Sequence, residues 1–333
     1  MRMFRPALVF TSLLLLVITL CACSTEAPAI TPGIPPQPRS PVAAASAEPS
    51  VRVIATRNFG TDLMFDKVVE LSPETSAMEA LKEVSDVETS YGAGFVNAIN
   101  GVRSGFTGDR KAKADWFIYI NGIQSNIGAL DYKLQPGDIE QWDFHDWGFR
   151  QFIPASIGAF PEPFLHGYGG KKRPTIIVTS DNLREPAQKL GNRLVELGVK
   201  DVRLSSNSEL SGPDREDSNL ILIDTVESEL ISEMNQNWEK LGFFTRFDNG
   251  NLVVLDTVGE TAATYSTDTG LIQAAQNPWN PNGIGACENV AWMVTGTDES
   301  GVKNALEILL EDNSQLQYAF AAVITNGEII RVP

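Results

Sequence analysis

The pattern of apolar residues changes across a stretch rich in proline and glycine, between residues 154 and 174. Before this stretch the chain has several short alternating runs and one helical run. After it, β-branched runs alternate regularly with helical ones. Strand and helix patterns bury their apolar faces in different layer arrangements, so the two sides must build different folds. We predict two domains, at 51–152 and 174–333, joined by a linker at 153–173.

The segment 51–152 predicts a small α+β domain. A capping-box pattern at Ser76 and Glu79 precedes apolar residues at helical spacing, which predicts one helix. This order, with strands before and after one helix, is typical of a roll in which a single helix lies across a mixed sheet. The strand candidates are 51–53, 67–71, 94–99, 115–120 and 139–144.

The segment 174–333 alternates apolar strands with helices. A β-branched run at 175–179 is followed by leucines at helical spacing from Leu183 to Leu197, and Gly198 ends the helix. Continuous apolar strands with crossover helices predict a three-layer α/β domain with a mostly parallel sheet and an antiparallel edge. The other expected elements are strands at 220–223, 252–255 and 290–294, helices around 230–241 and 302–309, and a hairpin around Asn326-Gly327.

A short motif occurs twice in the second segment. Residues 219–226 and 251–258 each form an apolar strand followed by Asp-Thr-Val. Ordinary strand and cap chemistry can produce such a repeat. The functional interpretation places Asp224 and Asp256 at the carboxyl ends of strands, where open α/β sheets bind ligands. No glycine-rich loop follows these strands, which argues against a nucleotide site.

The first segment resembles a known family through Trp116 to Gly122, Asp131-Tyr132, Pro136 to Asp138 and Trp142 to Phe144. From Val53 to Trp147 it is similar to the transcobalamin-like C-terminal family. The resemblance implies a β-grasp fold. Vertebrate members form half of the cobalamin clamp in transcobalamin and intrinsic factor, and bacterial members occur in exported proteins. The resemblance therefore implies a corrinoid as the ligand.

Aromatic and polar side chains are concentrated in the same part of the chain. Alternation along 115–120 places half of that strand on each face of the sheet, so some of its rings must belong to the core. Apolar walls with a few placed polar groups are the usual design of a small-molecule pocket. We predict as ligand-binding residues Trp116, Tyr119, Asn121, Asn126, Asp131, Tyr132, Trp142 and Trp147.

Two histidines are the metal-ligand candidates. His145 lies between Asp143 and Asp146, and a carboxylate can orient a ligating ring, so an axial bond to a corrinoid cobalt is one hypothesis. In the vertebrate relatives, as the resemblance implies, the cobalt contact comes from another domain. We expect His166, in the linker, to be solvated. We predict no other metal site and no permanently bound cofactor.

The amino terminus resembles the lipobox of a bacterial lipoprotein signal peptide. Two arginines precede the apolar run 7–20, which is shorter than the roughly 20 residues that a spanning helix needs. We predict a signal peptide at 1–22 and lipidation of Cys23, with an uncleaved anchor and acylation of Cys21 as alternatives. The protein is then anchored to the cell membrane on the extracytoplasmic face, at the cell surface or in the periplasm.

The next segment and the overall charge limit the partners. Residues 23–50 contain seven prolines among small residues, a composition that predicts a disordered stalk. Loss of Arg2 and Arg5 with the signal peptide leaves 24 basic against 42 acidic residues, a net charge near −18. Such a chain lacks the basic stripe of nucleic-acid binders. The expected partners are a small molecule, the membrane through the lipid, and a membrane transporter or envelope protein.

Few side chains are available for catalysis. The chain has two histidines, neither spaced for zinc, and after lipidation Cys287 is the one free thiol. An acidic neighbour, Glu288, disfavours its thiolate, so we expect a buried structural cysteine rather than a nucleophile. Paired carboxylates stay an alternative in so acidic a chain. We predict no enzyme.

These observations favour a lipid-anchored, extracytoplasmic binding protein. It would capture a small amphipathic ligand, with a corrinoid as the first hypothesis, for uptake. The first domain would hold the ligand, and the second would close the site or dock to a membrane partner. The alternative is a non-catalytic envelope module that binds protein or glycan, because the second segment loosely resembles α/β modules of prokaryotic S-layer and cell-surface proteins at 249–255 and 294–298.

Overall fold

The computed structural model describes residues 49–92, 94–107 and 111–333. The described residues form one compact unit with a mixed α+β fold of several sheets and few helices. Among the residues described, no helix is long and apolar enough to span a membrane. The predicted signal peptide, Cys23 and all but the last two residues of the predicted stalk lie outside the described residues.

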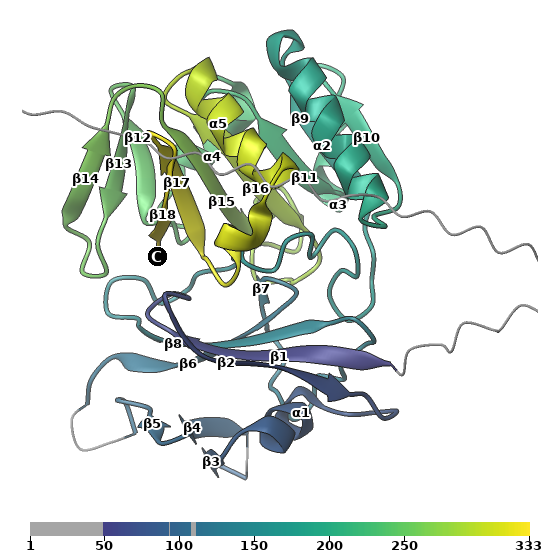
Figure 1. Cartoon of the computed structure of the whole chain (residues 1–333), viewed down its shortest axis with the longest axis vertical. Helices are drawn as coiled ribbons and strands as arrows, with labels where there is room; N and C mark the ends of the chain where they lie inside the picture. Colours follow the sequence, from purple (N-terminus) through teal and green to yellow (C-terminus); the bar gives the residue numbers. More distant parts are fainter. Residues whose placement is uncertain (1–48, 93, 108–110) are drawn as a thin grey trace, which may run out of the picture. The chain divides into compact units, whose positions relative to one another are not determined.

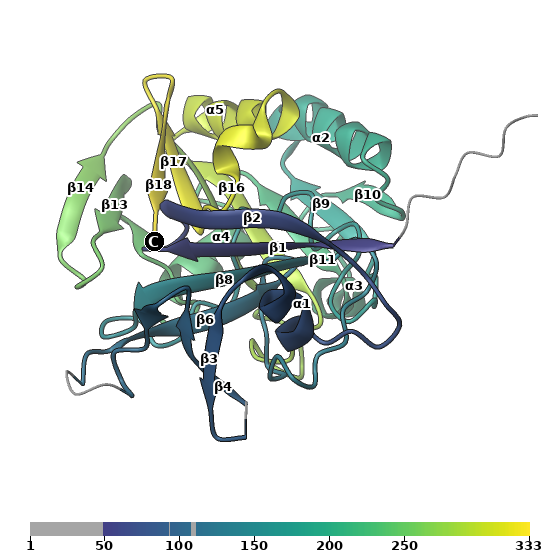
Figure 2. The same ribbon diagram turned by 60° about the horizontal axis from the view of Figure 1, so that its bottom comes forward.

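The first part of the unit contains two sheets and one helix. A five-stranded sheet has the order β2-β1-β8-β6-β7, in which β1 and β8 are parallel and the other neighbours antiparallel. The helix α1 and the sheet β3-β4-β5 lie on the same face of the five-stranded sheet (Figures 1 and 2). The elements are β1 (Ser50–Arg57), β2 (Asp62–Glu70), α1 (Ala77–Val84), β3 (Val87–Ser90), β4 (Phe95–Ile99), β5 (Val102–Arg103), β6 (Ala114–Ile120), β7 (Ile123–Gln124) and β8 (Ile139–Asp146).

The capping box predicted at the start of α1 is present. The backbone N–H of Glu79 donates to the Ser76 hydroxyl, and the backbone N–H of Ser76 donates to the Glu79 carboxylate. These two bonds satisfy amides that a helix leaves free at its first turn. The buried face of α1, including Met78 and Leu81, packs in one core with Val53 of β1.

The second part is built on a seven-stranded sheet with the order β10-β9-β11-β16-β15-β17-β18. The first four strands in this order, β10, β9, β11 and β16, are parallel to one another. Each later pair, β16 with β15, β15 with β17 and β17 with β18, is antiparallel. Its elements are β9 (Thr175–Thr179), η1 (Asp181–Leu183), α2 (Arg184–Glu196), β10 (Val202–Ser205), α3 (Gly212–Asp217), β11 (Asn219–Ile223), α4 (Glu229–Gln236), β15 (Gly270–Gln276), β16 (Val290–Gly296), α5 (Glu299–Leu310), η2 (Asn313–Leu316), β17 (Ala321–Thr325) and β18 (Glu328–Val332).

The sheet differs in part from the predicted mostly parallel sheet with an antiparallel edge. The antiparallel edge is one strand wider than predicted, because β15 pairs antiparallel with both β16 and β17, so the sheet is mixed. The sequence of β15, Gly-Leu-Ile-Gln-Ala-Ala-Gln, is poor in the β-branched and aromatic residues that are enriched in strands. Tertiary packing makes it a strand, since all seven of its residues are buried.

Helices cover both faces of this sheet. Ile177 and Ile221 pack in the same core as residues of α2 and α5. Their neighbours Ile176 and Leu220 belong to a different core, which contains Met234 of α4. The alternation follows from the two-residue period of a strand. Figure 1 shows α2 and α5 side by side on one face of the sheet.

The second copy of the repeated motif does not belong to this sheet. Residues 251–255 form β13 (Asn251–Leu255) of a small antiparallel sheet with β12 (Thr245–Asp248) and β14 (Thr261–Tyr265). Asp256 lies in the tight turn after β13, where its side chain accepts from the backbone N–H of Val258 and of Glu260. Asp256 thus stabilises a turn and does not lie at the end of a parallel strand. Asp224 directly follows β11, which is one of the parallel strands.

The segment predicted as a linker packs inside the unit. The backbone N–H of Ser156 donates to Gly122 of the first part, and that of Ile157 donates to Ala319 of the second. The ring of Phe164 lies 5.3 Å from that of Trp292 on β16. The segment 153–173 therefore contacts both parts, and the domain boundaries themselves stay predictions.

Candidate ligand site

Most of the predicted rings lie in the protein interior. Tyr119 is 1% exposed, and its hydroxyl donates to the backbone oxygen of Ile153 at 3.1 Å. Its ring packs edge-on against Phe320, with centroids 5.1 Å apart, in a core that contains residues of both parts of the unit. Tyr119 therefore joins the two parts and has almost no surface left for a ligand.

The three tryptophans have their own structural partners. The indole N–H of Trp116 donates to the backbone oxygen of Val102. That of Trp142 donates to Glu140, and that of Trp147 donates to Asp115. Trp116 and Trp142 are buried in the main core, and the strand alternation predicts that some of the rings belong there. The alternation does not tell which face of the strand the second part of the unit covers.

His145 is held inside the same interior. Its Nδ1 atom lies 2.8 Å from the Asp143 carboxylate, and its ring stacks against those of Phe59 and Phe117 at centroid distances of 4.5 and 4.3 Å. At 3% exposure it does not face a cavity. Among the residues described, no group of three or more His, Cys, Asp or Glu side chains could hold a metal ion.

Three predicted residues, Asn126, Asp131 and Tyr132, do line a cavity of about 550 Å³. Its wall comes from residues in the segments 126–135 and 168–173 and from 286–288, so both parts of the unit and the segment between them contribute. A cavity of this size is typical of small-molecule sites. We call it the junction cavity.

The helix α1 positions Tyr132. The backbone N–H of Ala77 donates to the backbone oxygen of Tyr132 at 3.0 Å, and the backbone N–H of Met78 donates to that of Ala129 at 2.9 Å. These amides belong to the first turn, where a helix has free donors. The first turn of α1 therefore holds the loop that carries Tyr132.

Asn121 positions the chain that carries Tyr168. Its side-chain amide donates to Asp138 at 2.8 Å and to the backbone oxygen of Gly167 at 2.6 Å, and its oxygen accepts from the backbone N–H of Ile139. Asn121 is fully buried and has a positive φ of 54°, a conformation that asparagine tolerates in the Asn-Gly turn after β6. It therefore contacts no cavity but fixes the chain next to Tyr168.

Two tyrosines form the aromatic wall. The rings of Tyr132 and Tyr168 are 5.1 Å apart, and the Tyr132 hydroxyl accepts from the backbone N–H of Gly169. The Tyr168 hydroxyl lies 2.6 Å from that of Ser125 and 3.3 Å from the Asn126 oxygen. Burial raises the pKa of Tyr132 well above its ordinary value and that of Tyr168 to about 12. Both hydroxyls stay neutral at physiological pH.

Charged side chains form the rest of the rim. Lys133, Lys171 and Arg173 line the cavity beside Asp131 and Glu288. The Arg173 guanidinium lies 3.3 Å from Glu288, and hydrogen bonds from Asn280 and Asn282 hold the pKa of the Glu288 carboxyl below its ordinary value. The rim can therefore bind both an anionic and a cationic group of a ligand, while the tyrosine rings offer an apolar surface.

Cys287 lines the junction cavity and is otherwise buried. Its backbone N–H donates to Gln276, and its thiol lies 3.2 Å from the backbone oxygen of Gln124. Burial raises the pKa of the thiol, which disfavours the nucleophilic thiolate. This geometry fits the expected structural cysteine.

Tyr168, Lys171 and Arg173 were not predicted as site residues. They lie in the stretch that we interpreted as a linker. The available signals were an aromatic residue among glycines and the basic cluster 171–173, which we interpreted as solvated surface. His166 of the same stretch, which we expected to be solvated, is partly buried. Its Nδ1 atom lies 2.5 Å from the Glu162 carboxylate, and the hydrogen bond raises the pKa of the ring.

Comparison with known proteins gives a partial identification. Residues 74–146 match the family model described as a domain of unknown function (DUF4430). This family is related to the transcobalamin-like domains. The match runs from just before α1 to the end of β8 and so includes the cavity residues of the first part.

Other comparisons add little to this match. Fourteen solved chains are similar to this one. One is a crystal structure from Ruminococcus gnavus described as a "putative metal binding protein", with 16% sequence identity, coverage of 30% of this chain and 98% of that chain, and a TM-score of 0.23. A similarity at that TM-score does not establish a shared fold. No curated protein matches the chain.

Proposed function

We propose that this protein is a lipid-anchored binding protein outside the cytosol that captures a small amphipathic ligand in the junction cavity. The observation that carries the proposal is the position of Asn126, Asp131 and Tyr132. All three were predicted as ligand residues, and all three line one cavity of about 550 Å³. Of the other predicted residues, Asn121 holds the chain next to Tyr168 and Tyr119 joins the two parts of the unit. The three tryptophans form hydrogen bonds within the first part.

The chemistry of the lining supports an amphipathic ligand. The faces of Tyr132 and Tyr168 would contact a flat apolar group, because aromatic side chains contribute large contact area at low entropic cost. Lys171 and Arg173 would bind an acidic or amide oxygen at the rim. The second part supplies Glu288 and so closes one side of the cavity, which gives that part a role in binding.

We infer a β-grasp domain at 51–152, supported by one helix packed on a mixed sheet, with a parallel pair between β1 and β8. We infer a three-layer α/β domain at 174–333, supported by the separate cores on the two faces of its sheet.

A corrinoid is the first ligand to test, because the match at 74–146 is to a family related to transcobalamin-like domains. Equilibrium dialysis of the purified full-length chain against cobalamin and cobinamide measures this directly. We expect binding that weakens in Lys171→Ala and is unchanged in Lys172→Ala, since Lys171 lines the cavity and Lys172 does not. No binding at about 100 μM would remove the corrinoid from the proposal.

The membrane attachment belongs to the same proposal. Acylation of Cys23 would hold the protein at the extracytoplasmic face of the cell membrane, where it could deliver ligand to a membrane transporter. The support is the sequence pattern of the first 23 residues. One acyl chain alone gives only marginal membrane binding, so stable anchoring requires more than one chain, as on a fully processed lipoprotein.

An envelope interaction module is the second candidate. Tyr91 is 84% exposed on the hairpin between β3 and β4, and Phe106 is 61% exposed. Exposed aromatic side chains are enriched in protein interfaces. Cross-linking in intact cells should then recover one protein partner, and that partner should be lost in Tyr91→Ala. Recovery of the same partner from both forms would argue against this candidate.

A further inference from the structure

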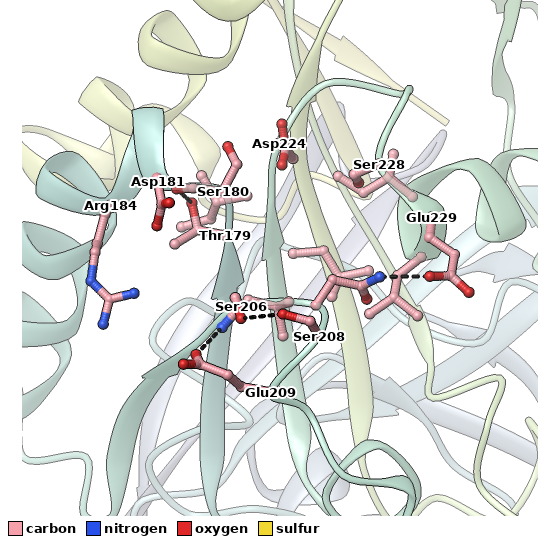
Figure 3. A pocket seen from close by; sticks show the side chains of 16 residues that line it. Thr179, Ser180, Asp181, Arg184, Ser206, Ser208, Glu209, Asp224, Ser228 and Glu229 are labelled. Carbon is pink, nitrogen blue, oxygen red and sulfur yellow. Dashed lines mark hydrogen bonds between the residues drawn. The ribbon is translucent and has the colours of Figure 1, made fainter.

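A second cavity, of about 660 Å³, lies at the carboxyl ends of the parallel strands (Figure 3). Its wall includes Thr179 at the end of β9, Ser206 directly after β10 and Asp224 directly after β11. Because β9 lies between β10 and β11 in the sheet, the chain leaves β9 toward one side and returns on the other. Open α/β sheets bind ligands at such a switch in strand order. We call this the switch-point cavity.

Several polar groups in its wall are free to bind a ligand. The hydroxyls of Ser180 and Ser228 make no capping bond, although each residue directly precedes a helix. One oxygen of Asp224 accepts from the backbone N–H of Thr225 at 2.8 Å, and its other oxygen has no bond among the described residues. Arg184 forms no ion pair with any described residue. Figure 3 shows Ser180, Asp224 and Ser228 around the same hollow.

The lining of the cavity argues against three ligand classes, each for a different reason. Four carboxylates line the wall with a single cation, Arg184, so a phosphate or another anion would be repelled. The carboxylates belong to Asp181, Glu209, Asp224 and Glu229. The wall contains no aromatic ring, which removes the usual cage for an organic cation. A metal ion also lacks support, since the described residues contain no group of three suitable ligands.

A neutral ligand with many hydroxyl groups fits what is left. Each hydroxyl of such a ligand can both donate and accept a hydrogen bond. It therefore matches a wall that contains carboxylate acceptors as well as guanidinium, amide and hydroxyl donors. Existing contacts already combine these groups. The Asn207 amide donates to Glu229 at 2.7 Å, and the hydroxyls of Ser206 and Ser208 lie 3.1 Å apart. We propose that the switch-point cavity is a second binding site, separate from the junction cavity, that takes a mono- or oligosaccharide.

The isoleucine methyl groups of the two cavities allow a direct test. Ile223 and Ile231 line the switch-point cavity, and Ile127 lines the junction cavity. We would follow their δ1 methyl signals by NMR in the purified full-length chain. The probes are glucose, mannose, N-acetylglucosamine, maltose and chitobiose, each to about 10 mM, with inorganic phosphate and spermidine as probes of the excluded classes.

We expect at least one saccharide to shift Ile223 and Ile231 without shifting Ile127. Asp224→Ala should weaken that binding about tenfold, as expected for the loss of one charge-assisted hydrogen bond, and Arg184→Gln should weaken it to a similar degree. Lys171→Ala, which changes only the junction cavity, should leave it unchanged. This control keeps failure of the saccharide site distinct from failure of the junction-cavity proposal.

Three results would overturn the inference. The first is that no saccharide shifts Ile223 or Ile231. The second is that phosphate or spermidine shifts them and the saccharides do not. The third is that saccharides shift Ile127 alone, which would assign them to the junction cavity. If Asp224→Ala has altered methyl spectra without ligand, the more conservative Asp224→Asn and Ser228→Ala replace it.

Discussion

The imidazole of His145 and the carboxylate of Asp143 form a buried pair, with Nδ1 and Oδ1 2.8 Å apart. Asp143 also accepts from the Thr56 hydroxyl at 2.6 Å and from the backbone N–H groups of Phe59 at 3.0 Å and Gly60 at 2.8 Å. The pair thus holds the turn between β1 and β2 at the place where that turn meets the second part. His145 is a structural residue in this arrangement, and the cobalt-ligand hypothesis has no support from its geometry.

Removal of the imidazole should destabilise the fold strongly. In His145→Ala the carboxylate loses a buried partner, and the space between the rings of Phe59 and Phe117 is left empty. We expect the free energy of unfolding to fall by about 3–5 kcal/mol, measured by urea denaturation. Lys303→Ala, which removes an exposed helix pair with Glu299, should cost less than about 0.5 kcal/mol. Equal costs for the two variants would contradict this role.

Close packing between the two parts predicts a difference between two glycines. Gly60 has a φ of 78°, and a Cβ atom there would lie 1.9 Å from the backbone oxygen of Tyr318. Gly101 has a φ of 81°, and a Cβ there would meet nothing within 4 Å. We expect Gly101→Ala to cost about 1–2 kcal/mol from backbone strain alone and Gly60→Ala to cost clearly more. A thermal shift no larger for Gly60→Ala than for Gly101→Ala would show that the parts do not pack this way.

Stability should decrease as the pH rises through neutrality. Burial raises the pKa of Glu140 from 4.5 to about 8. A hydrogen bond from Trp142 lowers this pKa, but its effect is smaller than that of burial. The folded state therefore binds an extra proton between about pH 4.5 and 8. This contribution to stability is fully present below pH 4.5, decreases as the pH rises, and is lost once the pH has passed 8. Glu140→Gln should reduce the loss of stability between pH 5 and pH 8, measured by denaturation at both values. An unchanged pH dependence would contradict this origin.

Lipidation of Cys23 predicts a defined change in location. Cells grown with a labelled fatty acid should incorporate the label into the wild-type protein, which should fractionate with membranes. Cys23→Ser should lose the label and leave the membrane fraction, while Cys21→Ser should keep both. Retention of the label by Cys23→Ser and its loss by Cys21→Ser would assign acylation to Cys21. An unlabelled wild-type protein in the cytosol would refute the proposed localisation.

Local signals in the sequence predicted much of the secondary structure. The β-branched run at 175–179 is β9, the leucines from 183 to 197 contain α2, and the Asn326-Gly327 pair is the turn of the hairpin between β17 and β18. Each of these patterns depends on residues close together in the chain. The strand β15 was missed because its burial comes from β16 and β17, which lie later in the sequence.

The candidate site was predicted only in part for a similar reason. The sequence shows that Trp116 and Tyr119 lie on opposite faces of their strand, but not that Phe320 of the second part covers Tyr119. Asn126 and Tyr132 were predicted because they lie in the segment with the family resemblance. Tyr168 and Lys171 join them across more than 30 residues of chain, through the bond from Asn121 to Gly167.

The most direct test of the account is whether the junction cavity binds a small ligand. The δ1 methyl signal of Ile127 in the full-length chain would be followed during titration with small amphipathic compounds, including cobalamin and cobinamide, each to about 100 μM. We predict that at least one compound shifts this signal, and that the response weakens in Lys171→Ala but not in Lys172→Ala. No shift with any compound, or an equal response in the two variants, would contradict the account.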